Sequence, residues 1–187
     1  MGSVGSGKSL LLLAMCGEAR LAAGTGSVVG KLAYVDKNPF FLDDTVRANI
    51  LFGNDYNDEL YWRVIKVCAL AEDIGQWRDH DLTAISDGGS NISGGQKARL
   101  ALARAVYTQA DIYILDDPLS AVDPKVRRHL LDHVLLNTGI LGDKLRVVSM
   151  NSDHLKPFAN KNIFLENRKA TVEVQAQPRL HSIATNR

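Results

Sequence analysis

The sequence predicts an α/β fold with a mostly parallel sheet and a phosphate-binding loop, and two stretches carry that prediction. Residues 2–9, GSVGSGKS, fit the G-x-x-x-x-G-K-S pattern of a loop whose backbone and lysine cradle phosphates. Residues 111–124, DIYILDDPLSAVDP, give a short apolar strand that ends in two carboxylates, followed by a turn and a helix start. Because ligands bind beyond the carboxyl ends of parallel strands, the two stretches predict one nucleotide site.

Length and composition fit one globular domain of 187 residues, 45% hydrophobic and 23% charged. The 22 basic and 21 acidic residues leave a formal charge of +1, which argues against nucleic acid as a partner and against a lipid-binding basic patch. Cys16 and Cys68 lack metal-ligand spacing, so we predict buried apolar thiols in a reducing compartment. The longest apolar run, Leu10–Cys16, is far shorter than the roughly 20 residues of a membrane helix, so no transmembrane segment is predicted in this chain.

The phosphate-binding loop is expected to lead into a helix over Ser9–Ala23, a stretch that is almost entirely apolar and therefore predicted to pack under the sheet. The backbone N–H groups at the start of this helix would converge on phosphate oxygens, Lys8 would add a positive charge, and Ser9 would offer its hydroxyl to Mg²⁺. The residues assigned to ATP are Gly2, Val4, Gly5, Ser6, Gly7, Lys8, Ser9 and Leu10.

Asp116 ends the apolar strand and is expected to hold Mg²⁺ through its water shell. Upstream, Asn91–Tyr107 places Ser93, Gly94 and Gly95 at the start of a helix, where bare N–H groups and a hydroxyl make a second anion site. One nucleotide does not need two phosphate sites. The second site is therefore predicted to serve a nucleotide held by another domain, in a head-to-tail pair with two ATP molecules between the partners.

The phosphate loop, ISGGQ, YILDD and SAVD, in this order, resemble the nucleotide-binding domain of an ABC transporter from Gly2 to about Asn167. The residues of these motifs are most similar to those of the first such domain of the multidrug-resistance-associated (C) subfamily. The resemblance implies a P-loop NTPase core that binds ATP and Mg²⁺ at the cytosolic face of a membrane, as part of an exporter. It also implies two partners, a second nucleotide-binding domain and the coupling helices of transmembrane domains. By the same resemblance the signature comprises Ser93, Gly94, Gly95 and Gln96, and the D-loop includes Ser120 and Asp123.

The resemblance further implies a helical signalling subdomain inserted at about residues 39–108, introduced by Pro39–Gly53. Asp58–Leu70 and Ile92–Tyr107 would be helices of this subdomain, with the turn at Gly88-Gly89 preceding the signature.

The ends of the chain depart from a complete domain of this kind. Residues 1–167 would form the ATP-binding domain without its first strands, because the strand and the adenine-stacking aromatic residue of the family are expected before Met1. Within residues 168–187, RKATVEVQ reads as a last short strand and PRLHSIATNR as a loose tail.

Three departures from the family pattern fall in one site. Lys37 stands where the family's glutamine contacts Mg²⁺ and water, and an ammonium has no acceptor lone pair. Asp117 stands where hydrolytic sites have glutamate, which leaves a shorter and weaker base. Asn151 takes the switch-histidine position and cannot carry a proton. Asn38 and His154 remain the residues that could replace the lost groups. The sequence thus predicts weak hydrolysis at this chain's own site.

Several alternatives stay open. The chain could be a non-catalytic fragment or regulatory partner that only pairs with another nucleotide-binding domain. A DNA-repair or chromosome-structure ATPase shares the signature, but the long heptad segments and basic stripe expected of it are missing. His129 and His133 resemble an inverted zinc-protease motif. They are better explained as a solvated helix face, opposite an apolar stripe that includes Val126 and Leu130.

Overall fold

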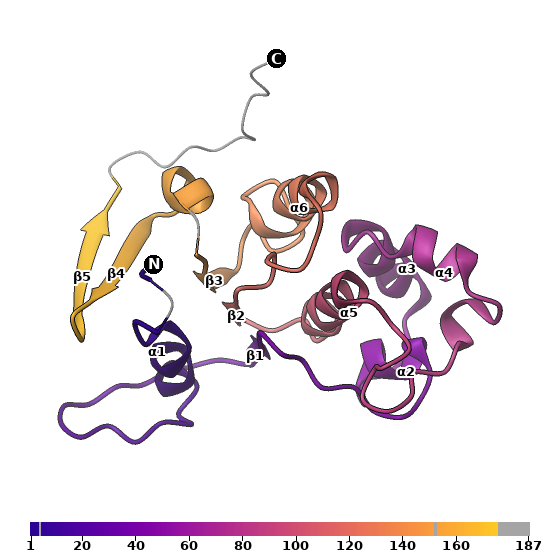
Figure 1. The fold of residues 1–187 in the computed structure, drawn as a ribbon, viewed down its shortest axis with the longest axis horizontal. Coiled ribbons are helices and arrows are strands. Elements are labelled where there is room, and N and C mark those ends of the chain that lie inside the picture. Colours follow the sequence, from indigo (N-terminus) through magenta and orange to yellow (C-terminus); the bar gives the residue numbers. More distant parts are fainter. Residues whose placement is uncertain (4, 152, 176–187) are drawn as a thin grey trace, which may run out of the picture.

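The computed structural model describes residues 1–3, 5–151 and 153–175, without the side chains of Asp153 and His154 (Figure 1). Its elements in chain order are α1 (Lys8–Met15), β1 (Leu32–Val35), α2 (Val46–Leu51), α3 (Asp58–Val67), α4 (Ala71–Gln76), η1 (His80–Leu82), α5 (Gly94–Tyr107), β2 (Ile112–Asp116), α6 (Pro124–Leu130), η2 (Leu131–Leu135), β3 (Leu145–Ser149), η3 (Asp153–Phe158), β4 (Lys161–Glu166) and β5 (Lys169–Val174). Val4 and the predicted tail PRLHSIATNR lie outside the described residues.

A parallel sheet in the order β1-β2-β3 confirms the predicted strand that ends in two carboxylates. The register pairs Val35 with Leu115 and Asp116 with Ser149, so the carboxyl ends of all three strands meet at one edge. The side chains of β2 are buried from Tyr113 onward, as expected for a central strand covered on both faces. This edge is where the predicted site residues come together.

Four helices, α2 to α5, follow β1 and precede β2 in the chain. Helix α5 contacts α2, α3 and β1, and Figure 1 shows this helical group at the opposite end of the molecule from α1 and the β4–β5 hairpin. The helices predicted over Asp58–Leu70 and Ile92–Tyr107 are present but shorter. Helix α3 begins at Asp58 as predicted and ends at Val67, just before Ala69 takes a left-handed φ of 55°, and α5 begins only after its Ser93 cap. The Gly88-Gly89 turn is confirmed by two positive φ angles, 61° and 90°.

Arg104 links α5 to the segment after β1 through hydrogen bonds. Its guanidinium donates to the carbonyl oxygens of Asn49 and Phe40 at 2.8 and 3.0 Å, and to Asn49 Oδ1 at 2.9 Å. The same group lies over the rings of Phe40, Phe41 and Phe52, at 4.6 to 5.2 Å from their centroids. Burial lowers the pKa of this guanidinium to about 10. Arg104 therefore holds an aromatic surface in place, in which Phe40 and Phe52 are exposed.

The predicted extent of the first helix is wrong. Helix α1 ends at Met15 instead of Ala23, because Gly17 takes a left-handed conformation with φ 82° and its N–H bonds back to the Ala14 carbonyl. Only Leu12 of the helix is buried, so the helix does not lie wholly under the sheet as expected. Helix propensity carried that prediction past a glycine that favours a helix end.

The antiparallel hairpin β4–β5 contains the predicted last strand. Asn167 and Arg168 form its tip with φ of 50° and 62°, the left-handed pair that a two-residue turn needs. On the other edge of β4, Met1 donates through its amino group to the Ile163 carbonyl and accepts from the Leu165 N–H at 2.9 Å. Met1 thus pairs with β4 as a parallel strand would.

The remaining expectations concern isolated side chains. Cys68 is buried, and burial raises the pKa of its thiol, whereas Cys16 is only partly buried, which corrects that prediction. The His129 and His133 rings lie 4.3 Å apart. His133 is exposed, but His129 is partly buried and contacts the Lys66 carbonyl, so the predicted solvated helix face is only partly exposed to solvent.

Within the described ranges, no three His, Cys, Asp or Glu side chains are grouped to hold a metal ion. Among those same residues no helix combines the length and apolarity needed to cross a bilayer.

Candidate functional site

The phosphate loop has the backbone shape that its glycines predict. Gly5 and Gly7 have φ of 80° and 96°, which glycine adopts without strain. A Cβ on Gly2 would lie 2.5 Å from Ser6 Oγ and 2.6 Å from the Leu165 carbonyl oxygen, so this position requires glycine too. Ser6 Oγ is buried and has no hydrogen-bond partner among the described residues. The loop leads into α1, whose first N–H groups have no acceptor within the helix. A phosphate group fits this arrangement because it would accept from these donors.

The Lys8 side chain bonds back to the start of the phosphate loop. Its ammonium donates to the carbonyl oxygens of Gly2 at 2.8 Å and Ser3 at 2.9 Å. Two of its three N–H groups therefore hold the loop, and the third is available to a ligand. Ser9 and Leu10, also assigned to ATP, are exposed at the start of α1.

Two buried aspartates end β2, and Ser149 links them. The Ser149 hydroxyl donates to Asp116 Oδ1 and accepts from the Asp117 N–H at 3.1 Å. Asp117 has φ 50°, a left-handed conformation that turns the chain away from the strand. Burial, together with the Asp36 and Asp116 carboxylates, raises the pKa of Tyr34 on β1 to about 12. The Asp36 and Asp116 carboxylates thus place negative charge near Tyr34 at the strand ends. Sequence reasoning missed Ser149, and its place at the end of the predicted neighbouring strand was the available signal.

The three departures from the family pattern meet at one carboxylate oxygen. Lys37 Nζ lies 3.7 Å from Asp117 Oδ2, and Asn151 Nδ2 donates to the same oxygen at 3.0 Å. Lys37 follows β1 and Asn151 follows β3, so Asp117 is held from both neighbouring strands. Asn38, the first alternative residue, is exposed, and its N–H bonds Asp36 Oδ1 at 2.7 Å. The side chain of the second alternative, His154, lies outside what the structure describes.

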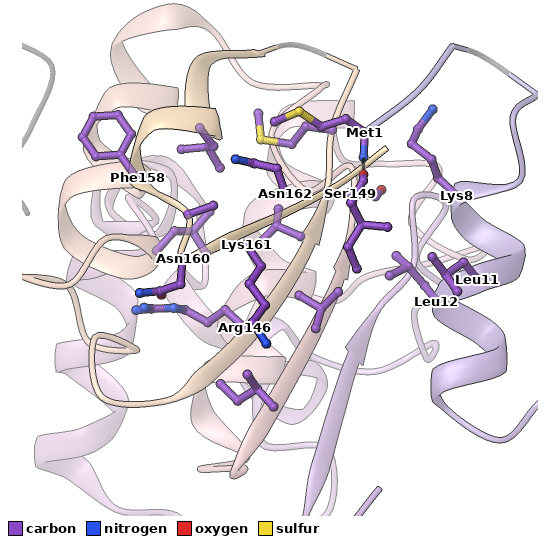
Figure 2. Close-up of a pocket in the computed structure, with 18 of the residues that line it drawn as sticks. Met1, Lys8, Leu11, Leu12, Arg146, Ser149, Phe158, Asn160, Lys161 and Asn162 are labelled. Carbon is purple, nitrogen blue, oxygen red and sulfur yellow. Dashed lines mark hydrogen bonds between the residues drawn. The ribbon is translucent and has the colours of Figure 1, made fainter. Parts of the chain in front are cut away.

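A cavity of about 430 Å³ lies between α1, β3 and β4. Figure 2 shows Lys8 and Ser149 on its wall near Met1, with Leu11 and Leu12 from α1 beside them. The cavity connects the predicted phosphate loop to the serine that binds Asp116, and most of its lining is apolar. The structure therefore brings the phosphate loop and the acidic strand end to one place.

The signature residues form the start of α5. Ser93 Oγ accepts from the Gln96 N–H at 3.2 Å, while Gln96 Oε1 accepts from the Ser93 N–H at 2.8 Å, which makes a capping box. Gln96 Nε2 also donates to Asp73 Oδ1 at 2.9 Å, and Arg99 pairs with Asp73 Oδ2 at 2.6 Å. This network fixes the helix start, and the Ser93 hydroxyl hydrogen remains available to an anion.

The predicted D-loop lies between the signature and Asp117. Ser120 Oγ donates to the Asp117 carbonyl at 2.9 Å. A Cβ on Gly95 would lie 3.3 Å from the Ala121 carbonyl oxygen, so the D-loop backbone and the signature are close neighbours. Asp123 Oδ1 accepts from the first N–H groups of α6 at 3.0 Å, and these bonds lower the pKa of Asp123.

The two aspartates differ in their fit to Mg²⁺. Among the described residues, the Asp116 carboxylate accepts one side-chain hydrogen bond, from the Ser149 hydroxyl, so with Ser9 it supplies the oxygen groups that Mg²⁺ prefers. Asp117 does not fit a metal-facing role, because an ammonium and an amide N–H already occupy Oδ2.

Residues 1–120 match the sequence profile of the ABC transporter family. The metal resistance protein YCF1 of Saccharomyces cerevisiae is 46% identical over 171 residues, 91% of this chain and 11% of that protein. ATP-binding cassette sub-family C member 4 of Homo sapiens is 47% identical over 169 residues, 90% of this chain and 13% of that protein. ABC transporter C family member 9 of Arabidopsis thaliana is 46% identical over 166 residues, 89% of this chain and 11% of that protein. The chain spans about a tenth of the length of these relatives.

Proposed function

Because the chain belongs to the ABC transporter family, whose ATP-binding domains have the P-loop NTPase fold, we propose that it is the ATP-binding domain of a membrane exporter. The proposed nucleotide contacts are those of the phosphate loop and the start of α1, with Ser9 and Asp116 holding Mg²⁺. ATP binding and hydrolysis would be coupled to transport at the cytosolic face of a membrane.

The proposed role of this chain's own site is to hold ATP with weak hydrolysis. The observation that carries this proposal is the convergence of Lys37 and Asn151 on Asp117 Oδ2. An oxygen that already faces an ammonium and accepts from an amide N–H is not free to receive a proton from an attacking water. The side chain is also one methylene shorter than glutamate, so it reaches less far toward an attacking water.

The proposed partners follow from two exposed surfaces, the start of α5 and the aromatic surface that Arg104 of α5 contacts. The Ser93, Gly94 and Gly95 start of α5 would complete the site of a second nucleotide-binding domain in a head-to-tail pair. Helices α2 to α5 would form the signalling subdomain. The surface with exposed Phe40 and Phe52, held by Arg104, would receive coupling helices of transmembrane domains.

The nucleotide assignment is tested by labelling the chain with a photoreactive ATP analogue. Lys8→Ala is expected to lower labelling by about tenfold or more, because it removes both the charge at the phosphates and the two bonds that close the loop. Lys66→Ala, at an exposed lysine of α3, is the matched control and should label like the unmodified chain. Unchanged labelling of Lys8→Ala would refute the assignment.

The cavity between β3 and β4 supports a proposal about the sheet. Strand β3 pairs with β2 and β4 pairs with β5, and Met1 already pairs with the other edge of β4. We propose that an extended apolar segment joined before Met1 lies in this cavity as a strand between β3 and β4, which completes a continuous sheet.

This proposal predicts a gain in stability when such a segment is added. Five alternating valine and isoleucine residues before Met1 should raise Tm by about 5–10 °C, the shift that a mid-range net gain of about 2.5 kcal/mol gives. Each buried side chain contributes about 2 kcal/mol, the ordered backbone costs about 1–2 kcal/mol per residue, and 1 kcal/mol shifts Tm by about 2–4 °C at this size. A glycine-serine extension of equal length is the control for thermal unfolding. Equal Tm values for the two extensions would contradict a strand site.

A further inference from the structure

Asp116 and Asp117 place two neighbouring carboxylates at the end of β2, with only 4% and 9% of each residue exposed. Buried carboxylates need donors or a cation to offset their lost hydration. Asp116 has the Ser149 hydroxyl, and Asp117 has the Asn151 amide and Lys37. Within the described residues, Lys37 is the one cation paired with either carboxylate. The site thus contains one ammonium beside two carboxylates.

The register of β1 and β2 sets the position of the Lys37 ammonium. Val35 pairs with Leu115 in the parallel ladder, and two residues beyond each partner the chain reaches Lys37 and Asp117. The Lys37 side chain is 49% exposed while that of Asp117 is 10% exposed. The ammonium therefore caps the buried carboxylate at the solvent-facing side of the strand ends, on a flexible four-carbon stem that can also reach an anion placed there.

A divalent cation and this ammonium compete for the same region. Like charges a few ångströms apart repel by about 1 to 4 kcal/mol per unit charge, depending on how much water separates them. Mg²⁺ also gives up its water reluctantly and needs oxygen ligands, whereas Lys37 supplies only N–H donors. Asp117 Oδ2, next to the Asp116 carboxylate, is already paired with this ammonium and is not free for a metal ion.

We infer that Lys37 acts as the resident cation of this site, so that the site binds nucleoside triphosphate in its metal-free form about as well as in its Mg²⁺ form. This inference rests on the proposed ATP-binding function. Lys37 would offset phosphate charge that Mg²⁺ offsets in other sites, so a Mg²⁺ ion held by Asp116 and Ser9 would add little to the affinity for the nucleotide. Lys37 thereby determines which form of the nucleotide is accepted.

The test is equilibrium binding of a fluorescent ATP analogue to the 187-residue chain, in excess Mg²⁺ and in excess EDTA. The unmodified chain is expected to show Kd values within about threefold of each other in the two buffers. Lys37→Gln removes the ammonium and restores an acceptor oxygen, so its Kd in EDTA should exceed that in Mg²⁺ by about tenfold or more. Lys66→Gln, at the exposed lysine of α3, controls for net charge and should behave like the unmodified chain. Circular dichroism checks that each variant is folded.

Each outcome has one meaning. Binding of the unmodified chain that needs Mg²⁺ would overturn the inference and leave the proposed function intact. The inference is also wrong if Lys37→Gln binds equally well in both buffers, because the cation would then lie elsewhere. Failure of the unmodified chain to bind the analogue in either buffer would instead overturn the proposed ATP-binding function.

Discussion

The triple variant Lys37→Gln, Asp117→Glu, Asn151→His is expected to hydrolyse ATP at this site about a hundredfold faster than the unmodified protein, provided that a partner supplies an intact signature. The variant removes the ammonium 3.7 Å from the Asp117 carboxylate and the amide donor at 3.0 Å. It also extends the carboxylate toward water and adds an imidazole that can carry a proton. All three changes act at one carboxylate, so their effects should depend strongly on one another.

Single reversions are therefore expected to recover little. Asp117→Glu alone leaves the longer carboxylate paired with Lys37 and Asn151, and Asn151→His alone leaves the short base in place. The assay is single-turnover hydrolysis in a two-domain transporter whose partner domain has its own acidic base disabled, so that only this site reports. Rates that rise equally in one single variant and in the triple variant would show that the three groups do not act as a unit.

Gly94→Asp is expected to stop ATP turnover at the partner's site. The start of α5 presents free N–H groups, and a carboxylate there would oppose the phosphate that they are proposed to bind. Space is not limiting, because a Cβ at Gly94 meets nothing nearer than the Ala121 Cβ at 3.9 Å. The loss should therefore be electrostatic, of about a hundredfold or more in turnover.

Gly94→Asn is the matched control, since asparagine has the shape of aspartate without its charge. It should keep far more turnover than Gly94→Asp, and raising the salt concentration should narrow the gap only slightly if the phosphate is bound away from solvent. Normal turnover in the Gly94→Asp protein would refute the head-to-tail arrangement. Equal loss in both variants would point to bulk and not charge.

The sequence predicted the local structure around the motifs well, because each such structure depends on a few neighbouring residues. The strand that ends in Asp116, the glycine turns and the capped start of α5 all follow from local chemistry, and all are present. The family pattern also predicted that Lys37, Asp117 and Asn151 share one site, and they meet in the structure.

Local sequence patterns do not predict which residues of distant segments come into contact. The bond from Ser149 to Asp116 depends on the register of β2 and β3, which no local pattern states. No local pattern states that Arg104 is partly buried with its guanidinium over three aromatic rings. The end of α1 was missed for the opposite reason, since the local signal at Gly17 was present and helix propensity was given more weight.

This chain's own site is proposed to hold ATP and to hydrolyse it only weakly. The most direct measurement identifies the nucleotide retained at this site in the unmodified protein, using ATP labelled on the α-phosphate and a partner domain whose acidic base is disabled. Sites that turn over about once per second would empty themselves of ATP many times within minutes. After that time, we expect the label retained at this chain's site to be ATP still. Recovery of the label as ADP would contradict this expectation, and would mean that Asn38 or His154 replaces the groups lost at Lys37, Asp117 and Asn151.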